Sequence, residues 1–195
     1  MATTQQGKYN MATKTEAEEL SQFGAKTGNT EDCLFGDTLI VTSTGEASTL
    51  KDLAENNIEA LEILATNDKG SIIKAKAHSF RAAQVTETIY IVTTYNGHTI
   101  RASANHLFLL GDNQWVKAEK LQTGDVLKAG FLDGKSSKKN DISLHLNYIL
   151  TVDKVNLTTP VTMYDFTVDT HENLFIGQKI EGKLSLICVH SSQKN

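Results

Sequence analysis

The chain has 195 residues and a formal net charge of −4 at pH 7, which is enough length for one domain with a short appendage. There is no basic excess to neutralise phosphates, so the composition disfavours a nucleic-acid-binding protein. The apolar runs are too short for a membrane span or a signal peptide, and we expect a soluble, cytoplasmic protein. The 2 cysteines and 6 histidines lack the spacing of a zinc site, so no metal site is expected.

The first part of the chain differs in composition from the rest. Residues 1–32 are polar and short of β-branched apolar side chains, which predicts a mostly flexible flank with at most a short helix at 15–23. From residue 33 onward, alternating apolar and polar residues and turn signals recur at roughly ten-residue intervals, which is the pattern of an all-β domain. A polar stretch at 134–141 predicts a flexible linker within that domain.

The predicted elements of the all-β segment follow one another closely. Strands are predicted at 38–42, 61–66, 71–78, 88–94, 98–102, 142–154, 161–168, 174–177 and 184–190. Thr49 and Asp52 form a capping pattern, which predicts one short helix at 48–56. Turn residues at 67–70 and 95–97 predict two hairpins.

Cys33 stands just ahead of the first predicted strand and directly after an acidic, turn-like stretch. A deprotonated thiol in that position can attack a carbonyl carbon. The alternative is that Cys33 is a small buried apolar residue, as isolated cysteines commonly are. The position alone leaves both interpretations open.

Two further groups of residues could take part in chemistry. Ser103 and His106 lie at a strand end, where a turn can direct both side chains at one peptide bond. The alternative for His106 is an ordinary hydrogen-bonded turn histidine. Asp165 and Thr167 share the strand face opposite their aromatic neighbours, so the carboxylate points either at a site or at solvent.

The last predicted strand ends in polar residues. His190, Ser191 and Ser192 place an imidazole beside two hydroxyl groups. By contrast, Trp115 and Tyr164 lie beside strand ends and are predicted to be core residues.

Together these motifs resemble those of inteins, which are self-splicing domains of the Hint fold. The chain has Cys-Leu-x-x-Asp-Thr from Cys33, Ser-x-x-His ending at His106, and Trp-Val-Lys-Ala-x-x-Leu-x-x-Gly-Asp-x-Leu from Trp115. Tyr-Asp-Phe-Thr-Val follows from Tyr164, and Val-His-Ser ends at Ser191. The resemblance covers residues 33 to about 191 and implies a mini-intein without a homing endonuclease. It also implies an all-β, horseshoe-like Hint fold of many short strands with one or two short helices.

The resemblance implies roles for the residues of the first step. Cys33 looks like the first intein residue, whose sulfur attacks the Asp32 carbonyl in an N-to-S acyl shift. His106 looks like the histidine that strains the scissile amide or protonates its nitrogen, and Ser103 stands where inteins usually have threonine. Asp165 looks like the carboxylate that tunes the first nucleophile and the exchange step that follows.

The resemblance also implies roles near the end of the chain. His171 matches the later histidine that assists the carboxy-terminal step, and His190 matches the penultimate histidine. Inteins end in His-Asn followed by Cys, Ser or Thr, whereas His190 precedes Ser191 and Ser192. Ser191 then stands at the asparagine position, and Ser192 is the acceptor for transesterification. Serine has no carboxamide to cyclise, so we expect a domain, engineered or natural, that starts splicing and cannot complete it.

These roles imply an upstream flank at 1–32, a splicing domain at 33–191 and a downstream stub at 192–195. The domain is expected to act once on its own flanking segments, as a monomer and without a cofactor. One rival within the fold is a hedgehog-type or bacterial intein-like domain that releases its flank without ligation. Rivals of other classes are a cysteine protease that acts in trans through Cys33 and His106, and a non-catalytic β-rich binding module.

Two further expectations concern the middle and the end of the domain. Residues 127–134 partly resemble one dodecapeptide of a LAGLIDADG homing endonuclease, either as a remnant or as an ordinary strand and turn. No nuclease activity is expected in either case. Cys188 lies on a strand expected to run beside the first one, so a disulfide with Cys33 that blocks the acyl shift is an alternative to plain core packing.

Overall fold

The computed structural model describes residues 26–27, 32–132 and 142–191. The helix expected at 15–23, the linker expected at 134–141 and Ser192 lie outside these ranges.

Strands make up nearly all of the regular structure in the described ranges. They are β1 (Lys26–Thr27), β2 (Leu34–Phe35), β3 (Leu39–Val41), β4 (Ala47–Thr49), β5 (Ala60–Thr66), β6 (Ile72–Thr94), β7 (Thr99–Ala102), β8 (Leu107–Leu109), β9 (Trp115–Lys117), β10 (Val126–Leu132), β11 (Ile142–Val168), β12 (Asn173–Ile180) and β13 (Lys183–His190). The helical elements are α2 (Leu50–Glu55) and a 3-10 turn, η1 (Ala118–Lys120).

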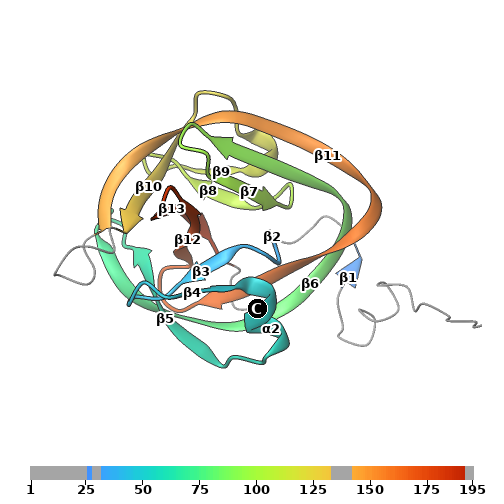
Figure 1. The fold of residues 1–195 in the computed structure, drawn as a ribbon, viewed down its shortest axis with the longest axis horizontal. Coiled ribbons are helices and arrows are strands. Elements are labelled where there is room, and N and C mark those ends of the chain that lie inside the picture. The colour runs from blue at the N-terminus through green and yellow to red at the C-terminus, as the bar shows by residue number, and fades with distance from the viewer. Residues whose placement is uncertain (1–25, 28–31, 133–141, 192–195) are drawn as a thin grey trace, which may run out of the picture.

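Two long strands, β6 and β11, curve around the outside of the molecule and pair antiparallel along much of their length (Figure 1). The strands predicted at 71–78 and 88–94 are continuous in β6, and those predicted at 142–154 and 161–168 are continuous in β11. The pairing shifts register at several points, one of them between Asn156 and Val161. Such β-bulges bend a strand without ending it, so each pair of predicted strands forms one curved strand.

The last strand occupies a central position. β13 pairs with β10 along one edge and with β12 along the other, and Val189 also pairs with Phe108 of β8. In Figure 1, β12 and β13 lie inside the curve formed by β6 and β11. β2, which follows Cys33, pairs instead with β7 and β11.

The short helix forms where the capping pattern predicted it. Thr49 has an extended backbone, and its hydroxyl accepts a hydrogen bond of 3.1 Å from the Asp52 N–H. This bond satisfies one of the amide groups that a helix start leaves unpaired. Leu50 and Leu53 are buried, so the helix covers the core with one face.

The two cysteines lie in different parts of the core, and no disulfide joins them. Cys33 packs in an apolar cluster with Met163, whereas Cys188 packs in a cluster with Phe175. Because β13 is not a neighbour of β2, the expected disulfide between Cys33 and Cys188 is wrong, and plain core packing holds for Cys188.

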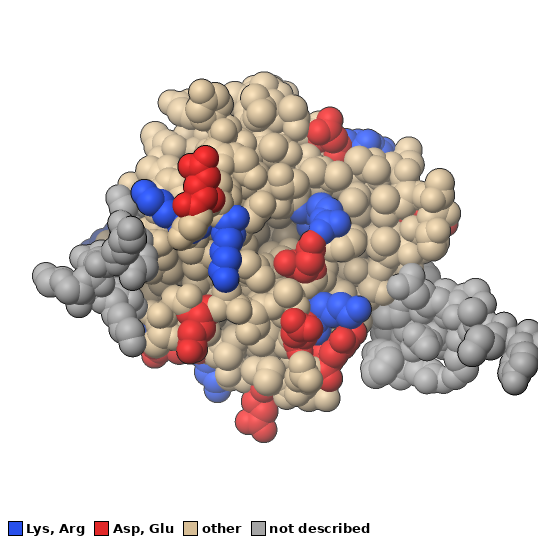
Figure 2. All heavy atoms as spheres, in the orientation of Figure 1, with Lys and Arg blue, Asp and Glu red and all other residues tan. Residues whose placement is uncertain are grey.

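Of the two aromatic residues predicted to lie in the core, one does and one does not. Tyr164 is 8% exposed and belongs to the core as predicted, but Trp115 is 36% exposed and does not. The segment that resembles a LAGLIDADG dodecapeptide is, over its described part, strand β10 paired on both edges. On the face in Figure 2, basic and acidic side chains are interspersed. No helix in the described ranges is long and apolar enough to span a membrane.

Candidate active site

Cys33 is fully buried, and Ser103 holds its backbone. The Cys33 N–H donates a hydrogen bond of 3.0 Å to the Ser103 hydroxyl, and the Cys33 carbonyl accepts one of 2.9 Å from the Ser103 N–H. The nitrogen of the Asp32–Cys33 peptide bond is therefore fixed by a side chain from the end of β7. The sequence placed Ser103 near a peptide bond, and the structure shows that it is this one.

His106 lies in the same turn, and its backbone N–H donates a hydrogen bond of 3.2 Å to the Ser103 backbone carbonyl. The imidazole is 1% exposed and stands edge-on to Phe108, with ring centroids 5.5 Å apart. Neither ring nitrogen completes a hydrogen bond of ordinary geometry. The ring is thus enclosed, and the Asp32 backbone lies near its nitrogens in a contact too poorly aligned to count as an ordinary hydrogen bond.

Burial, with a smaller contribution from the nearby His190, lowers the pKa of His106 to about 3. The backbone of Asp32 is close enough to oppose this shift in pKa. His106 is therefore a neutral imidazole at physiological pH, located beside the peptide bond that Cys33 would attack. A neutral ring can accept a proton from a thiol and pass it on.

His190 lies between two carboxylates. Its Nδ1 is 3.8 Å from Asp32 Oδ2, and its Nε2 is 3.7 Å from Glu172 Oε2. Burial lowers the pKa of His190, and the two carboxylates oppose that shift. Burial likewise raises the pKa of Asp32, against the pull of His190 and Lys117. Trp115, which the sequence predicted to be a core residue, instead stands edge-on to the His190 ring, with the two ring centroids 5.3 Å apart.

The carboxylate of Asp165 is 1% exposed, so it does not point into solvent. Its Oδ2 accepts a hydrogen bond from Arg81 Nη2, which forms an ion pair between β11 and β6. The preceding residue, Tyr164, pairs with Leu34 of β2. Asp165 is thus on the strand that runs beside the segment starting at Cys33. Arg81 was missed because nothing in its surroundings in the sequence marks it.

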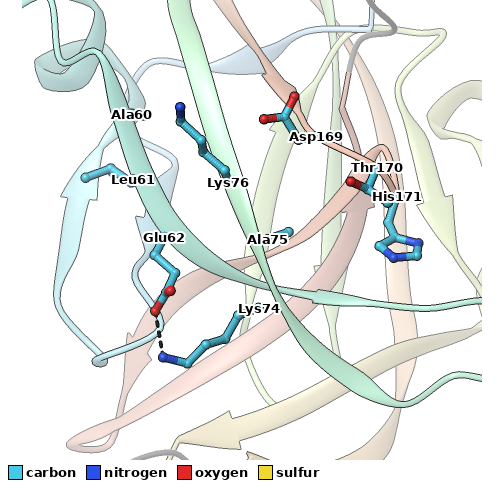
Figure 3. Close-up of a pocket in the computed structure, with 9 residues that line it drawn as sticks. All are labelled: Ala60, Leu61, Glu62, Lys74, Ala75, Lys76, Asp169, Thr170 and His171. Carbon is cyan, nitrogen blue, oxygen red and sulfur yellow. Dashed lines mark hydrogen bonds and ion pairs between the residues drawn. The ribbon is translucent and has the colours of Figure 1, made fainter.

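The structure does not bring His171 to this site. His171 lines a separate hollow of about 550 Å³ with residues of β5 and β6, including Glu62 and Lys74 (Figure 3). Its neighbour Glu172, which has a positive φ of 48°, is the residue that reaches His190. Sequence reasoning missed Glu172 by one position, because the tight turn that directs its side chain inward contains no glycine or proline as a signal.

Ser191 continues the ladder beyond the last residue of β13. Its N–H donates a hydrogen bond of 2.8 Å to the Glu172 carbonyl. The residue is 1% exposed, and its hydroxyl has no hydrogen-bond partner. The sequence-predicted residues Cys33, Ser103, His106, His190 and Ser191 therefore come from distant parts of the chain to one region, around Asp32. In the described ranges, no three metal-binding side chains form a cluster.

The family of the chain follows from comparison with known proteins. The model of the intein splicing domain matches residues 39–181. The chain belongs to the intein splicing family. It is an autocatalytic protein splicing element, and the expected all-β Hint fold is confirmed.

This intein is similar to solved structures of other intein and intein-like domains. The structure of a DnaB intein from Synechocystis sp. PCC 6803 has 28% sequence identity and a TM-score of 0.61, and the match covers 83% of this chain and 99% of that one. The fold alone is shared with a bacterial intein-like domain from Clostridium thermocellum, with 21% identity, a TM-score of 0.61, and 83% and 100% of the two chains covered.

Among curated proteins, the replicative DNA helicase DnaB of Rhodothermus marinus is 32% identical to this intein over 95 residues, which are 49% of this chain. The chain spans only 10% of that helicase's length.

Proposed function

We propose that this intein carries out the first step of splicing at Cys33 and cannot carry out the asparagine cyclisation that ends it. The observation that supports the first half is the arrangement around the Asp32–Cys33 peptide bond. The N–H of this bond, which belongs to Cys33, donates a hydrogen bond of 3.0 Å to the Ser103 hydroxyl. The neutral His106 ring lies beside the backbone of Asp32, the residue that supplies the carbonyl of the bond. The Cys33 thiol is the nucleophile within the same residue pair.

The first step is an N-to-S acyl shift. Cys33 Sγ attacks the Asp32 carbonyl carbon, a C–S bond forms, and the C–N bond breaks. His106 accepts the thiol proton and returns it to the departing Cys33 amine, so protons balance within the site. An unperturbed thiol is only a few per cent thiolate at neutral pH, so the step needs a group that takes up the thiol proton as the sulfur attacks. Because the groups are held together by the fold, the attack is intramolecular.

Asp165 is assigned a supporting role in this step. The half-buried ion pair with Arg81 holds the negative charge of the Asp165 carboxylate on the strand beside β2. That charge stabilises positive charge developing on the imidazole or the departing amine. The positive charge of Arg81 offsets part of this stabilisation. The Arg81–Asp165 pair as a whole therefore determines the electric field at the first nucleophile.

At the carboxy-terminal end, His190 and Glu172 stand where the last peptide bond of the domain would be cut. Glu172 reaches His190 with its carboxylate and Ser191 with its backbone carbonyl. We therefore assign assistance of this step to Glu172, rather than to His171 as the sequence suggested. Ser191 has no carboxamide nitrogen, so it cannot form the succinimide that releases the downstream segment.

The second candidate function is release of the upstream flank without ligation. It shares the Cys33 step and is favoured by the same observation, the serine at position 191. In that case a thiol or water, and not the downstream segment, takes the acyl group from the thioester. A cysteine protease acting in trans is less compatible with the structure, because Cys33 is fully buried.

The test compares two substitutions at position 191. Ser191→Asn supplies the missing carboxamide and is expected to yield excised 33–191 and a ligated product of the two flanks, detected by mass spectrometry. Ser191→Asp has nearly the same shape without the amide nitrogen, and no ligated product is expected. If Ser191→Asn gives no ligated product, the assignment of Ser191 to the asparagine position is wrong.

A second measurement tests the first step independently. Dithiothreitol is expected to release residues 1–32 from the parent chain and not from the Cys33→Ala variant. Absence of release from the parent would remove the acyl shift, and with it the proposed function.

The similarity to DnaB helicases supports a further part of the proposal. We infer that the natural host is an intracellular protein of that type and that the intein works in the cytoplasm on the segments flanking it. The sequence of the natural precursor is the check. Helicase segments on both sides of the intein would support the inference, and a secreted host would contradict it.

A further inference from the structure

The hydroxyl of Ser191 is buried and has no hydrogen-bond partner. Leaving a buried hydroxyl unpaired is unfavourable, and native proteins rarely do it without a functional reason. The backbone N–H of Ser191 donates a hydrogen bond of 2.8 Å to the Glu172 carbonyl. The side chain is thus fixed in place by the ladder while its oxygen remains available for reaction.

The strand places Ser191 on the same face as His106. Along β13, Ile187 and Val189 pack in the large core cluster, and Val189 lies directly opposite Phe108. Side chains alternate along a ladder, so Ser191 follows Val189 on that face. The His106 ring stands against Phe108, with centroids 5.5 Å apart.

Asp32 contacts both histidines of this part of the site. Its backbone is next to the His106 ring, and its carboxylate is 3.8 Å from the Nδ1 of His190, the residue before Ser191. After the acyl shift, the carbon bound to Cys33 sulfur is the Asp32 carbonyl carbon. That carbon therefore belongs to a residue that contacts both His106 and His190, and Ser191, with its buried and unpartnered hydroxyl, directly follows His190.

We propose that Ser191 itself, and not the following Ser192, accepts the acyl group from the Cys33 thioester, which leaves the upstream flank on the chain as a branched ester. This rests on the proposed function, because it requires the thioester. Ser191 Oγ attacks the Asp32 carbonyl carbon, a C–O bond forms, and the C–S bond breaks. The proton lost by the hydroxyl passes through the neutral His106 ring to the departing Cys33 sulfur, which becomes a thiol.

The product has distinct chemical properties. Its mass equals that of the precursor, because each step only rearranges bonds. Cys33 acquires a free α-amine, and residues 1–32 end in an ester to Ser191. Thiols cleave thioesters but leave oxygen esters intact, whereas hydroxylamine cleaves both.

The experiment quantifies the ester in the full-length chain. The protein is incubated under native conditions, then denatured in acid to stop exchange between thioester and ester. One half is treated with dithiothreitol and the other with hydroxylamine, and released 1–32 is measured by mass spectrometry. The parent is expected to release at least twice as much flank with hydroxylamine as with dithiothreitol. Digestion should yield a branched peptide that joins Asp32 to Ser191.

Two alanine variants locate the acceptor. In Ser191→Ala, hydroxylamine and dithiothreitol are expected to release equal amounts, because only the thioester remains. In Ser192→Ala, the excess released by hydroxylamine is expected to persist. Removal of an unpaired hydroxyl does not disturb packing, and release by dithiothreitol in Ser191→Ala shows that the variant is folded and active at Cys33.

The other outcomes are equally decisive. Loss of the excess in Ser192→Ala with its retention in Ser191→Ala assigns the acceptor to Ser192 and overturns the inference. Equal release by both reagents from the parent overturns the inference but leaves the acyl shift at Cys33 intact. Failure of both reagents to release the flank overturns the acyl shift as well.

Discussion

Two buried histidines are expected to make this protein sensitive to acid. Burial lowers the pKa of His106 to about 3 and that of His98 to about 4. The unfolded chain has ordinary histidines with pKa values near 6.5, so it binds protons that the folded chain does not. Stability conferred by the neutral rings is therefore present above the unfolded pKa and is lost as the pH falls towards the folded values.

The magnitude follows from the difference in proton binding. Between about pH 7 and about pH 5, each ring costs the folded state about 2 kcal/mol, so the two together cost about 4 kcal/mol. The lowered pKa of His190 adds to this loss, and the raised pKa of Asp32 opposes it. The free energy of unfolding is measured by urea titration with circular dichroism, in a Cys33→Ala background so that no reaction occurs.

A single substitution isolates one ring. His98 Nδ1 is 3.2 Å from the Ser185 hydroxyl, and His98→Asn keeps a polar group near that position without a group that titrates. The variant is expected to lose about 2 kcal/mol less than the Cys33→Ala parent over the same pH range, whatever its stability at neutral pH. An identical pH dependence in the two proteins would refute the reasoning.

Other variants test the fold at single contacts. Arg81→Met removes the ion-pair partner of the buried Asp165 carboxylate and is expected to lower the free energy of unfolding by about 1–3 kcal/mol, with less loss when Asp165→Asn is added; a double-mutant cycle checks this. Gly177→Ala would bring a Cβ to 2.6 Å from Val41 Cγ2, and a loss of about 1–3 kcal/mol is expected in urea titration. Thr49→Ala removes the helix cap, and calorimetry is expected to show a Tm about 2–4 °C lower.

Local patterns in the sequence were sufficient where a short segment determines its own structure. Thr49 caps the helix as predicted, because the cap and its partner amide are three residues apart. The two predicted hairpins also form: β5 pairs with the start of β6, and the end of β6 pairs with β7. In both, the turn and the alternating strands are adjacent in the chain, so the sequence contains the whole signal.

Long-range pairing could not be read in this way. The continuity of β6 and β11 depends on their pairing with each other, which supports each strand through stretches that lack a clear strand pattern. The predicted neighbour relation of Cys188 and Cys33 failed for the same reason, since strand order in a sheet is not encoded locally. Motifs in order identified the family, but distances between them came only from the fold.

At the site, residue type was a better guide than residue position. The predicted Ser103 and His106 lie beside the Asp32–Cys33 bond, because both belong to one tight turn. Glu172 and Arg81 were missed, because one depends on an unusual backbone turn and the other on cross-strand pairing.

The central position of β13 also affects when the protein can react. Cys33 leaves the ribosome early, but the strand that bears His190 is made about 157 residues later, roughly 8–30 s at ~5–20 residues per second. Until then, β10 and β12 have no strand between them, and nothing packs against Phe108 from that side. A chain terminated before β13 is therefore expected to lack His190 and the strand that packs against Phe108, and to keep its upstream segment attached.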